Sequence, residues 1–287
     1  MYVSVRDATI EHAGFPTIMD GLKALGLSAV ELGFDRQRTT NLLDGGQTVL
    51  DSPDAIAAYK DHLEENGVRG TAFLLANNFN HDDLDEELDW IVDTVLAADA
   101  LGMEAVRIDS VMKGERDWPL EERVGRFVEC LKKIIERTPD TDIHLGMENH
   151  GFQGNDPNFL DGVIEGVGGN RVGLTLDTGN FYWRGHPIDN VYDIIEHFSS
   201  FTRHTHVKNI NYPEDVRATE RELGWKYGEY VSPIPDGDID HARVVEILEA
   251  ANYTGDMCIE DESLGKFEGD ERKTTLKRDA DYLLGLV

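Results

Sequence analysis

Short apolar segments alternate with longer amphipathic segments along the whole chain, and this alternation constrains the fold more than any other feature. Eight short stretches rich in β-branched and apolar residues are predicted strands. They cover Tyr2–Val5, Ala29–Phe34, Val68–Leu75, Ala105–Asp109, Ile143–Asn149, Val172–Leu176, His204–Lys208 and Met257–Glu260. The intervening segments are predicted helices, and several begin near Pro, Ser or Asp and end at Gly, the usual start and stop signals. They include residues 16–26, 52–67, 84–102, 119–138 and 239–253, with a closing helix over 273–287.

Eight strand–helix units in 287 residues have the number and length of a (β/α)8 TIM barrel. A doubly wound open sheet is the competing architecture, but no GxGxxG or GxxxxGK[ST] motif follows an early strand. No linker rich in Pro, Gly or Ser divides the chain, so we expect one α/β domain over residues 1–287. One long irregular stretch, residues 210–235 after the seventh strand, is expected to serve as a lid or an oligomer contact.

Composition limits the setting of this domain. Hydrophobic residues make up 40% of the chain, which is enough for a large core. No run of some 18 apolar residues is present, and the first residues lack a signal-peptide pattern, so we expect a cytoplasmic protein without membrane contact. Cys130 and Cys258 lie in apolar surroundings and are predicted to be buried free thiols.

The chain is strongly acidic, with 56 acidic and 27 basic residues and a formal net charge of −29. Such a surface repels phosphate backbones, so nucleic acid is not an expected partner. The acidic residues are distributed through the predicted helices and do not form a tail. This distribution resembles that of halophilic proteins, which are adapted to high salt.

Four consecutive predicted strands end in side chains that can bind a metal ion. Glu148 ends the fifth strand, Asp177 follows the sixth, His206 lies in the seventh and Glu260 ends the eighth. Asp177 follows Glu148 by 29 residues, and His206 follows Asp177 by the same interval, close to one βα unit. In a TIM barrel such strand ends meet at the catalytic face, so we expect the four side chains to lie together.

Three carboxylates and one imidazole form a mixed oxygen and nitrogen donor set, which suits Mn²⁺, Mg²⁺ or Co²⁺. Alone, each residue has an ordinary structural explanation, such as a solvated glutamate, a turn at Asp177 or a core histidine at His206. His204 shares the strand face of His206 and is expected one layer deeper in the barrel. Lys208 is expected beyond His206, where it could hold a substrate oxygen or could be a surface lysine.

The segments "GMENHG", "LTLDTGN", "HTHVKN", "PDGDID" and "GDMCIEDE" resemble the sugar phosphate isomerase/epimerase superfamily with the xylose-isomerase-like TIM barrel. The resemblance implies one divalent metal, usually Mn²⁺, bound by Glu148, Asp177, His206 and Glu260. It also implies that Glu148 and Glu260 act as the catalytic acid and base. Many members, and the related apurinic-site endonucleases, have a histidine where this chain has Asn180. The early strand ends also lack the extra histidines of those endonucleases, so a DNA-repair function is disfavoured.

The resemblance implies a carbohydrate substrate and an enediolate formed when the proton next to a carbonyl leaves. Returning the proton gives an isomerase or epimerase, whereas loss of a β-hydroxyl gives a dehydratase, as in the inosose dehydratase branch. A hydrolase or a non-catalytic sugar-binding protein is a further alternative. A homo-oligomer, dimer or tetramer, is expected by analogy. The remaining candidates for substrate binding are His150, Asn180, Arg107, Arg217 and Trp183.

Overall fold

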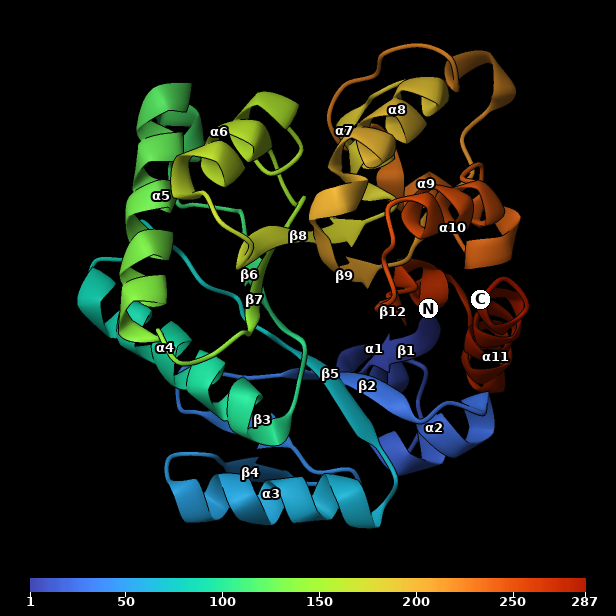
Figure 1. Ribbon diagram of the computed structural model, residues 1–287. Coiled ribbons are helices and arrows are strands. Elements are labelled where there is room, and N and C mark those ends of the chain that lie inside the picture. Colours follow the sequence, from blue (N-terminus) through green and yellow to red (C-terminus); the bar gives the residue numbers. More distant parts are fainter.

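A computed structural model describes residues 1–287, and its centre is a sheet of eight parallel strands surrounded by helices (Figure 1). The strands are β1 (Tyr2–Arg6), β2 (Ala29–Gly33), β5 (Arg69–Leu74), β6 (Ala105–Asp109), β7 (His144–Glu148), β8 (Val172–Asp177), β9 (Thr202–His206) and β12 (Asp256–Ile259). Their order is β12-β1-β2-β5-β6-β7-β8-β9. A single parallel bridge between Val207 and Ile259 joins the two ends, so the barrel is nearly closed. The predicted TIM barrel is confirmed.

Helices cover the outside of the strands. They are α1 (Asp7–His12), α2 (Ile18–Leu25), α3 (Pro53–Glu65), α4 (Leu84–Leu101), α5 (Leu120–Arg137), α6 (Pro157–Val167), α7 (Asn180–Arg184), α8 (Ile188–Phe198), α9 (Tyr227–Tyr230), α10 (His241–Ala250) and α11 (Asp270–Leu284). Short 3₁₀ turns lie at Glu115–Asp117, Ser199–Phe201, Glu214–Val216, Ile234–Asp236 and Glu262–Lys266. No helix has the length and apolar character that a membrane crossing requires.

The helix boundaries follow the capping residues of the sequence. The Ser52 side chain accepts a hydrogen bond from the Ala55 amide at the start of α3, and Asp83 does the same for Glu86 in α4. Gly102 ends α4 in the left-handed conformation, with φ of 72°, which costs glycine no steric penalty. These local signals explain why the predicted helix limits agree with the structure within a few residues.

The segment over residues 210–235 contains a few short regular elements. β10 (Asn209–Ile210) pairs with β11 (Val231–Ser232) in an antiparallel ladder, and two 3₁₀ turns and α9 occupy part of the remainder. The short elements lie toward the two ends of the segment, while residues 217–226 form no helix or strand, in keeping with the irregular stretch expected there. The ladder forms because the two ends of the segment lie side by side. Asn209 Nδ2 donates to the Ile234 and Ile239 carbonyls at the same position. A second small ladder, β3 (Thr39–Asn41) with β4 (Gln47–Val49), follows β2.

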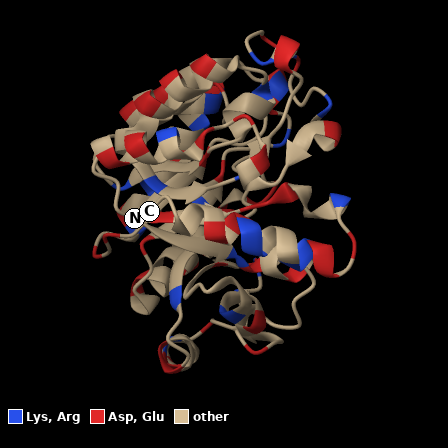
Figure 2. Ribbon diagram, turned by 90° about the vertical axis from the view of Figure 1, so that its right-hand side faces the viewer, with Lys and Arg blue, Asp and Glu red and all other residues tan.

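The interior divides into an apolar and a charged part. A cluster of 63 buried apolar residues fills the space between strands and helices. Charged side chains that are almost fully buried gather inside the barrel, among them Glu31, Arg107, Glu148, Asp177, His204, His206, Lys208 and Asp256. Cys130 and Cys258 are both buried and free, as predicted. Figure 2 shows that the acidic residues, drawn in red, are distributed along the helices and loops and do not gather in one segment.

Candidate metal centre and active site

The ends of β7, β8, β9 and β12 bring four predicted residues together. Glu148, Asp177, His206 and Glu260 each place one candidate ligand atom within 4.8 Å of those of the others, and all four residues are buried. Strand register accounts for part of this, because Asp177 lies directly opposite His206 in the β8–β9 pair. We call these four residues the ligand cluster.

Asp177 presents one oxygen to the ligand cluster and uses the other within its own turn. Its Oδ1 accepts hydrogen bonds of 2.8 Å from the backbone amides of Gly179 and Asn180. Its Oδ2 is buried and has no hydrogen-bond partner, although Lys208 Nζ lies 3.1 Å away as an ion pair. The turn therefore fixes the carboxylate and leaves Oδ2 available.

Glu260 shows the same division. Its Oε1 pairs with the Arg6 guanidinium, which extends from the end of β1. Its Oε2 is buried without a hydrogen-bond partner, 3.4 Å from His206 Nδ1 and 3.5 Å from Lys208 Nζ. Arg6 thus restrains Glu260 and keeps Oε2 directed at the ligand cluster.

Glu148 is held at both oxygens. Asn180 Nδ2 donates to Oε1 at 3.2 Å, and the Arg107 guanidinium forms hydrogen bonds and an ion pair with Oε2. Glu148 Oε2 also lies 3.4 Å from His206 Nδ1. The Arg107 side chain further donates to the Leu75 carbonyl, so it ties the fourth strand of the barrel to the third and to the fifth.

Three of the four members of the ligand cluster carry an unpartnered buried polar atom: Asp177 Oδ2, His206 Nδ1 and Glu260 Oε2. Lys208 Nζ forms ion pairs with two of these atoms, but none of the three has a hydrogen bond. A buried polar atom without a hydrogen bond costs about 1–3 kcal/mol, so three that lie close together favour a common partner. A divalent cation bound by oxygen and nitrogen donors satisfies all three at once. The residues present therefore fit a divalent metal ion.

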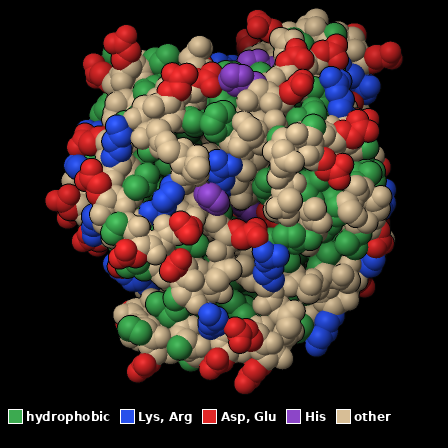
Figure 3. All heavy atoms as spheres, viewed as in Figure 1, with side chains coloured by type: hydrophobic (Ala, Val, Ile, Leu, Met, Phe, Trp, Pro, Cys, Tyr) green, Lys and Arg blue, Asp and Glu red, His purple; other side chains and the backbone are tan.

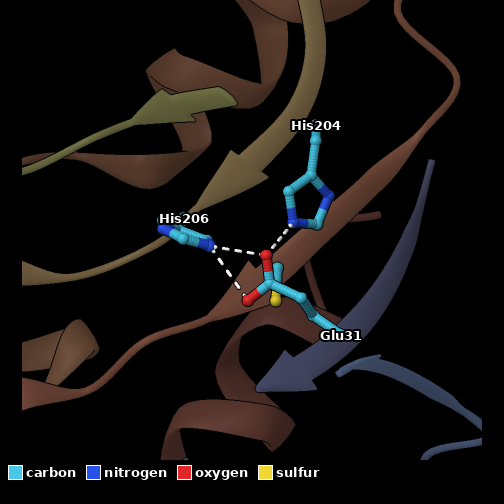
Figure 4. Close-up of side chains that lie close together, drawn as sticks. Glu31, His204 and His206 are labelled. Carbon is cyan, nitrogen blue, oxygen red and sulfur yellow. Dashed lines mark hydrogen bonds and ion pairs between the residues drawn. The ribbon is translucent and has the colours of Figure 1, made fainter. Parts of the chain in front are cut away.

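A second buried cluster adjoins the first, and Figure 4 shows its central members. Glu31 from β2 accepts from the Nε2 atoms of His204 and His206, each 2.9 Å from Oε1. His204 Nδ1 lies 2.8 Å from Asp256 Oδ1 on β12. Cys258 Sγ lies within 4.8 Å of the Glu31, His204 and His206 ligand atoms. We call Glu31, His204 and Asp256 the relay cluster.

Charge interactions set the protonation of both clusters. Burial opposes ionisation of Glu148, but the charge of Arg107 outweighs it and holds the pKa of Glu148 well below its usual range. Burial raises the pKa of Asp177, and Lys208 opposes that rise. Burial lowers the pKa of His204, yet Asp256 and Glu31 raise it well above its ordinary value. His204 is therefore a buried imidazolium between two carboxylates.

Among the predicted substrate-binding residues, four lie at or beside the ligand cluster. Lys208 and Asn180 contact it directly, as described above, and Arg107 pairs with Glu148. His150 is half-exposed, and its Nδ1 lies 3.0 Å from Asp109 Oδ1 at the end of β6. Figure 3 shows basic, acidic and histidine side chains together near the middle of one face of the molecule.

Arg217 and Trp183 both contact the segment that follows β9. Arg217 pairs with Asp238 at 3.0 Å and donates to the Tyr212 carbonyl, so it is engaged within the segment that follows β9. Trp183 is half-buried in α7, against Gly224 of the same segment. The structure does not bring Arg217 to the ligand cluster, because its guanidinium is already paired.

The sequence prediction missed Arg6 and Glu31. Both lie on the first two strands, and each contacts a residue more than 170 positions away. It also missed Glu262, which accepts from Lys208 Nζ at 3.2 Å and from the Tyr227 hydroxyl. A charged residue in the middle of an apolar strand, as in "AVELG", was the available signal for Glu31.

Comparisons with known proteins agree with this architecture. Two curated relatives are inosose dehydratases, and the chain spans about half the length of each. The one from Clostridium botulinum (strain Eklund 17B / Type B) is 27% identical over 150 residues, 50% of this chain and 48% of that protein. The one from Geobacillus thermodenitrificans (strain NG80-2) is 24% identical over 166 residues, 53% of this chain and 54% of that protein.

Solved structures match over nearly the full length. The IOLI protein with a binding zinc atom has a TM-score of 0.71 at 14% identity, over 99% of this chain and 98% of that one. A D-tagatose 3-epimerase-like protein has a TM-score of 0.66 at 17% identity, with the same coverage. At these identities the likeness shows the fold. The family model described as "Xylose isomerase-like TIM barrel" matches residues 19–285. This chain belongs to the xylose isomerase-like TIM barrel family.

Proposed function

We propose that the protein is a divalent-metal-dependent enzyme that removes the proton next to the carbonyl of a sugar, sugar phosphate or keto-polyol. The observation that carries the proposal is the convergence of three unpartnered buried atoms in the ligand cluster. Glu148, Asp177, His206 and Glu260 would hold the ion, and Mn²⁺ is the expected metal, with Mg²⁺ or Co²⁺ as alternatives. When bound, the ion would supply Lewis-acid stabilisation of the negative charge that develops on a substrate oxygen.

The two glutamates are the proposed acid and base. Glu148 is kept ionised by Arg107, so at neutral pH it can accept a proton. Glu260 directly follows β12 and has Arg6 and Lys208 beside it. One glutamate would take the proton and keep it, and the other, in its protonated form, would deliver its own proton. Delivery to the opposite face of the same carbon would complete an epimerisation, and delivery to the neighbouring carbon an isomerisation.

Cationic and polar side chains would orient the substrate. Lys208 is buried among three carboxylates, which outweigh the effect of burial and raise its pKa, so it stays protonated and can hold an anionic oxygen. His150 at the rim and Asn180 beside Glu148 are further candidates for contact with substrate hydroxyls. Trp183 stays a candidate wall of the pocket, whereas Arg217 is occupied by Asp238.

Dehydration of an inosose-like keto-polyol is the second candidate function, and the curated relatives favour it, since they are inosose dehydratases. Both reactions begin with removal of the same kind of proton. They differ in the second step, because the proton returns to carbon in one reaction and a β-hydroxyl departs in the other.

Solvent exchange tests the proposal. The protein is incubated with Mn²⁺ or Mg²⁺ in D₂O, at low and high salt, with a panel of ketoses, ketose phosphates and inososes. NMR after removal of the metal should show deuterium next to the carbonyl, and Glu260→Gln should abolish it. The product then separates epimerase, isomerase and dehydratase. Absence of exchange on every substrate, with metal shown to be bound, would contradict enolisation.

Two further expectations have their own measurements. A homo-oligomer is expected, and light scattering measures it. Adaptation to high salt is expected from the acidic surface, and thermal unfolding across a KCl series measures it. Both are independent of the chemistry of the ligand cluster.

A further inference from the structure

We propose that Glu31 is a positioning residue that fixes the ring orientation and the tautomer of His206, so that Nδ1 faces the ligand cluster. This inference rests on the proposed function, since it concerns how the chain prepares His206 for a metal ion. Glu31 lies on β2, far in sequence from the four candidate ligands, and its side chain is 1% exposed.

The two ring nitrogens of His206 have different surroundings (Figure 4). Nε2 lies 2.9 Å from Glu31 Oε1 and 3.1 Å from Oε2. Nδ1 lies on the other side of the ring, 3.4 Å from both Glu148 Oε2 and Glu260 Oε2, without a hydrogen bond. An ionised carboxylate can only accept hydrogen bonds, so the proton of a neutral His206 sits on Nε2. The Nδ1 lone pair is then free to bind a cation.

Glu31 is itself held as a carboxylate by two other donors. His204 Nε2 lies 2.9 Å from Oε1, and Arg6 Nε lies 3.3 Å from Oε2. His204 is fixed in turn by Asp256, which also accepts from the Ser4 hydroxyl and the Tyr253 hydroxyl. Glu31 therefore cannot turn away from His206 without losing two further partners.

Arg6 extends the influence of Glu31 to a second candidate ligand. Its Nε pairs with Glu31, and its Nη1 pairs with Glu260 Oε1. The Glu260 oxygen that faces the ligand cluster is the one that Arg6 leaves free. One buried carboxylate thus orients His206 directly and Glu260 through Arg6.

The same atoms could instead hold a second metal ion, because Glu31, His204, His206 and Cys258 offer ligand atoms within 4.8 Å of one another. Hydrogen bonding decides against this. The side-chain oxygens and nitrogens of Glu31, His204 and Asp256 all have partners, whereas the unpartnered atoms lie on the ligand cluster. A cation among Glu31, His204 and His206 would also meet two N–H groups and displace both protons.

The first experiment compares Glu31→Gln with Glu87→Gln. Glu87 is an equally buried glutamate of α4 that pairs with Arg36, away from both clusters. Mn²⁺ binding to the chelator-treated protein is measured by calorimetry. Glu31→Gln should weaken binding by about 10–100-fold, the usual effect of removing a partner behind a metal-binding histidine. Glu87→Gln should bind like the unmodified protein, and equal affinity in a folded Glu31→Gln variant would overturn the inference.

The second experiment reads the tautomer of His206 directly. Histidine-labelled unmodified protein is loaded with Zn²⁺, and long-range ¹H–¹⁵N NMR identifies the protonated and the metal-bound nitrogen. We expect Nε2–H with zinc at Nδ1, and one zinc per chain. Zinc at Nε2, or a second zinc equivalent, would overturn the inference, and this measurement needs no variant to fold.

The two proposals fail in different ways. If the unmodified protein binds no divalent metal, the proposed function fails. The metal-free spectrum still tests the role of Glu31, because Nε2–H on His206 is expected there too and Nδ1–H would contradict it. If metal binds tightly and Glu31→Gln has no effect, only the role of Glu31 fails.

Discussion

The ligand cluster and the relay cluster are both buried and charged, and they meet at His206, but they differ in whether their polar atoms have hydrogen-bond partners. In the relay cluster, carboxylate and imidazole groups alternate from Asp256 through His204 to Glu31, and every nitrogen and oxygen has a partner. In the ligand cluster, one atom each of Asp177, His206 and Glu260 is left without a hydrogen bond. The comparison teaches that two clusters of similar residue types can be told apart by their hydrogen bonds. The cluster whose polar atoms all have partners holds its neighbours in place, whereas the cluster with atoms that lack hydrogen bonds is the candidate ligand site.

The largest expected effect is on the folding stability of the relay cluster. His204→Asn leaves Glu31 and Asp256 buried without the imidazolium between them, and breaking a buried pair costs about 3–5 kcal/mol. Denaturant unfolding of the metal-free protein measures it. His197→Asn is the matched control, because its 2.9 Å pair with Asp161 is exposed and worth about 0–1 kcal/mol. Equal losses in the two variants would remove the distinction between a supporting cluster and a surface pair.

Removing a member of the ligand cluster should act on metal binding. Asp177→Asn replaces one carboxylate oxygen, either Oδ2 or the hydrogen-bonded Oδ1, with an NH₂ group that cannot bind a cation. Mn²⁺ affinity should fall more than about 100-fold, which exceeds the effect expected from removing a residue that only orients a ligand. Calorimetry measures the affinity. Asp7→Asn is the control, because Asp7 is also buried and accepts from the Gly33 amide, outside both clusters. Unchanged binding in Asp177→Asn would place the metal elsewhere.

Lys208 should compete with a divalent ion for the same oxygens. Its Nζ lies 3.1 Å from Asp177 Oδ2 and 3.5 Å from Glu260 Oε2. Lys208→Met should therefore tighten Mn²⁺ binding by about ten-fold. Two charges about 4 Å apart interact by a few kcal/mol at the dielectric of a protein site, and other charges near Lys208 offset part of its repulsion of the ion. Lys208→Arg keeps the charge and should show no such gain. Weaker binding in Lys208→Met would mean that the lysine supports the site.

A buried carboxylate oxygen without a hydrogen bond can also mean that two carboxyl groups share a proton. Asp279 of α11 provides such a case outside the ligand cluster. Asp279 Oδ2 and Asp261 Oδ2 both lack partners, while Asp279 Oδ1 accepts from the Ile234 amide at 3.0 Å. Burial, and then Asp261, raise the pKa of Asp279 from 3.8 to about 9. The group's contribution to stability is then fully present below pH 3.8 and is lost as pH rises through about 9.

Asp279→Asn should remove that pH dependence. The melting temperature of the variant, taken relative to that of the unmodified protein, should be higher at pH 9 than at pH 5. Each kcal/mol of stability corresponds to a shift of about 2–4 °C. Thermal unfolding at the two pH values measures it. Asp270→Asn on the same helix is the control, since that side chain is 93% exposed. An unchanged difference would show that these two oxygens share no proton.

The smallest effect is expected at Cys258, the sulfur beside the relay cluster. Burial raises the pKa of its thiol to about 12, and the thiolate is the form that binds metals. Cys258→Ala should change Mn²⁺ affinity by less than about two-fold. Loss of a bound metal equivalent in this variant would assign an ion to the relay cluster and reverse the comparison.

Much of the barrel could be predicted from the sequence. The strands were predicted within a few residues, because their apolar runs and the capping signals of the helices are local properties. The seventh strand was placed two residues late, since Lys208 was included although the strand ends at His206. The 210–235 segment was predicted as irregular, because the β10–β11 ladder depends on contacts between its two distant ends.

By itself, the sequence determined the barrel and the four residues of the ligand cluster. A repeat of about one βα unit between Glu148, Asp177 and His206 places them at matching strand ends in any barrel of this length. Only the tertiary structure showed that Glu31 and Arg6 reach the same place. Barrel closure pairs β1 with β12, and the side chains of β2 cross the interior to β9. Contacts across a closed barrel have no sequence spacing, so the partners that orient the candidate ligands emerge only when the chain has folded.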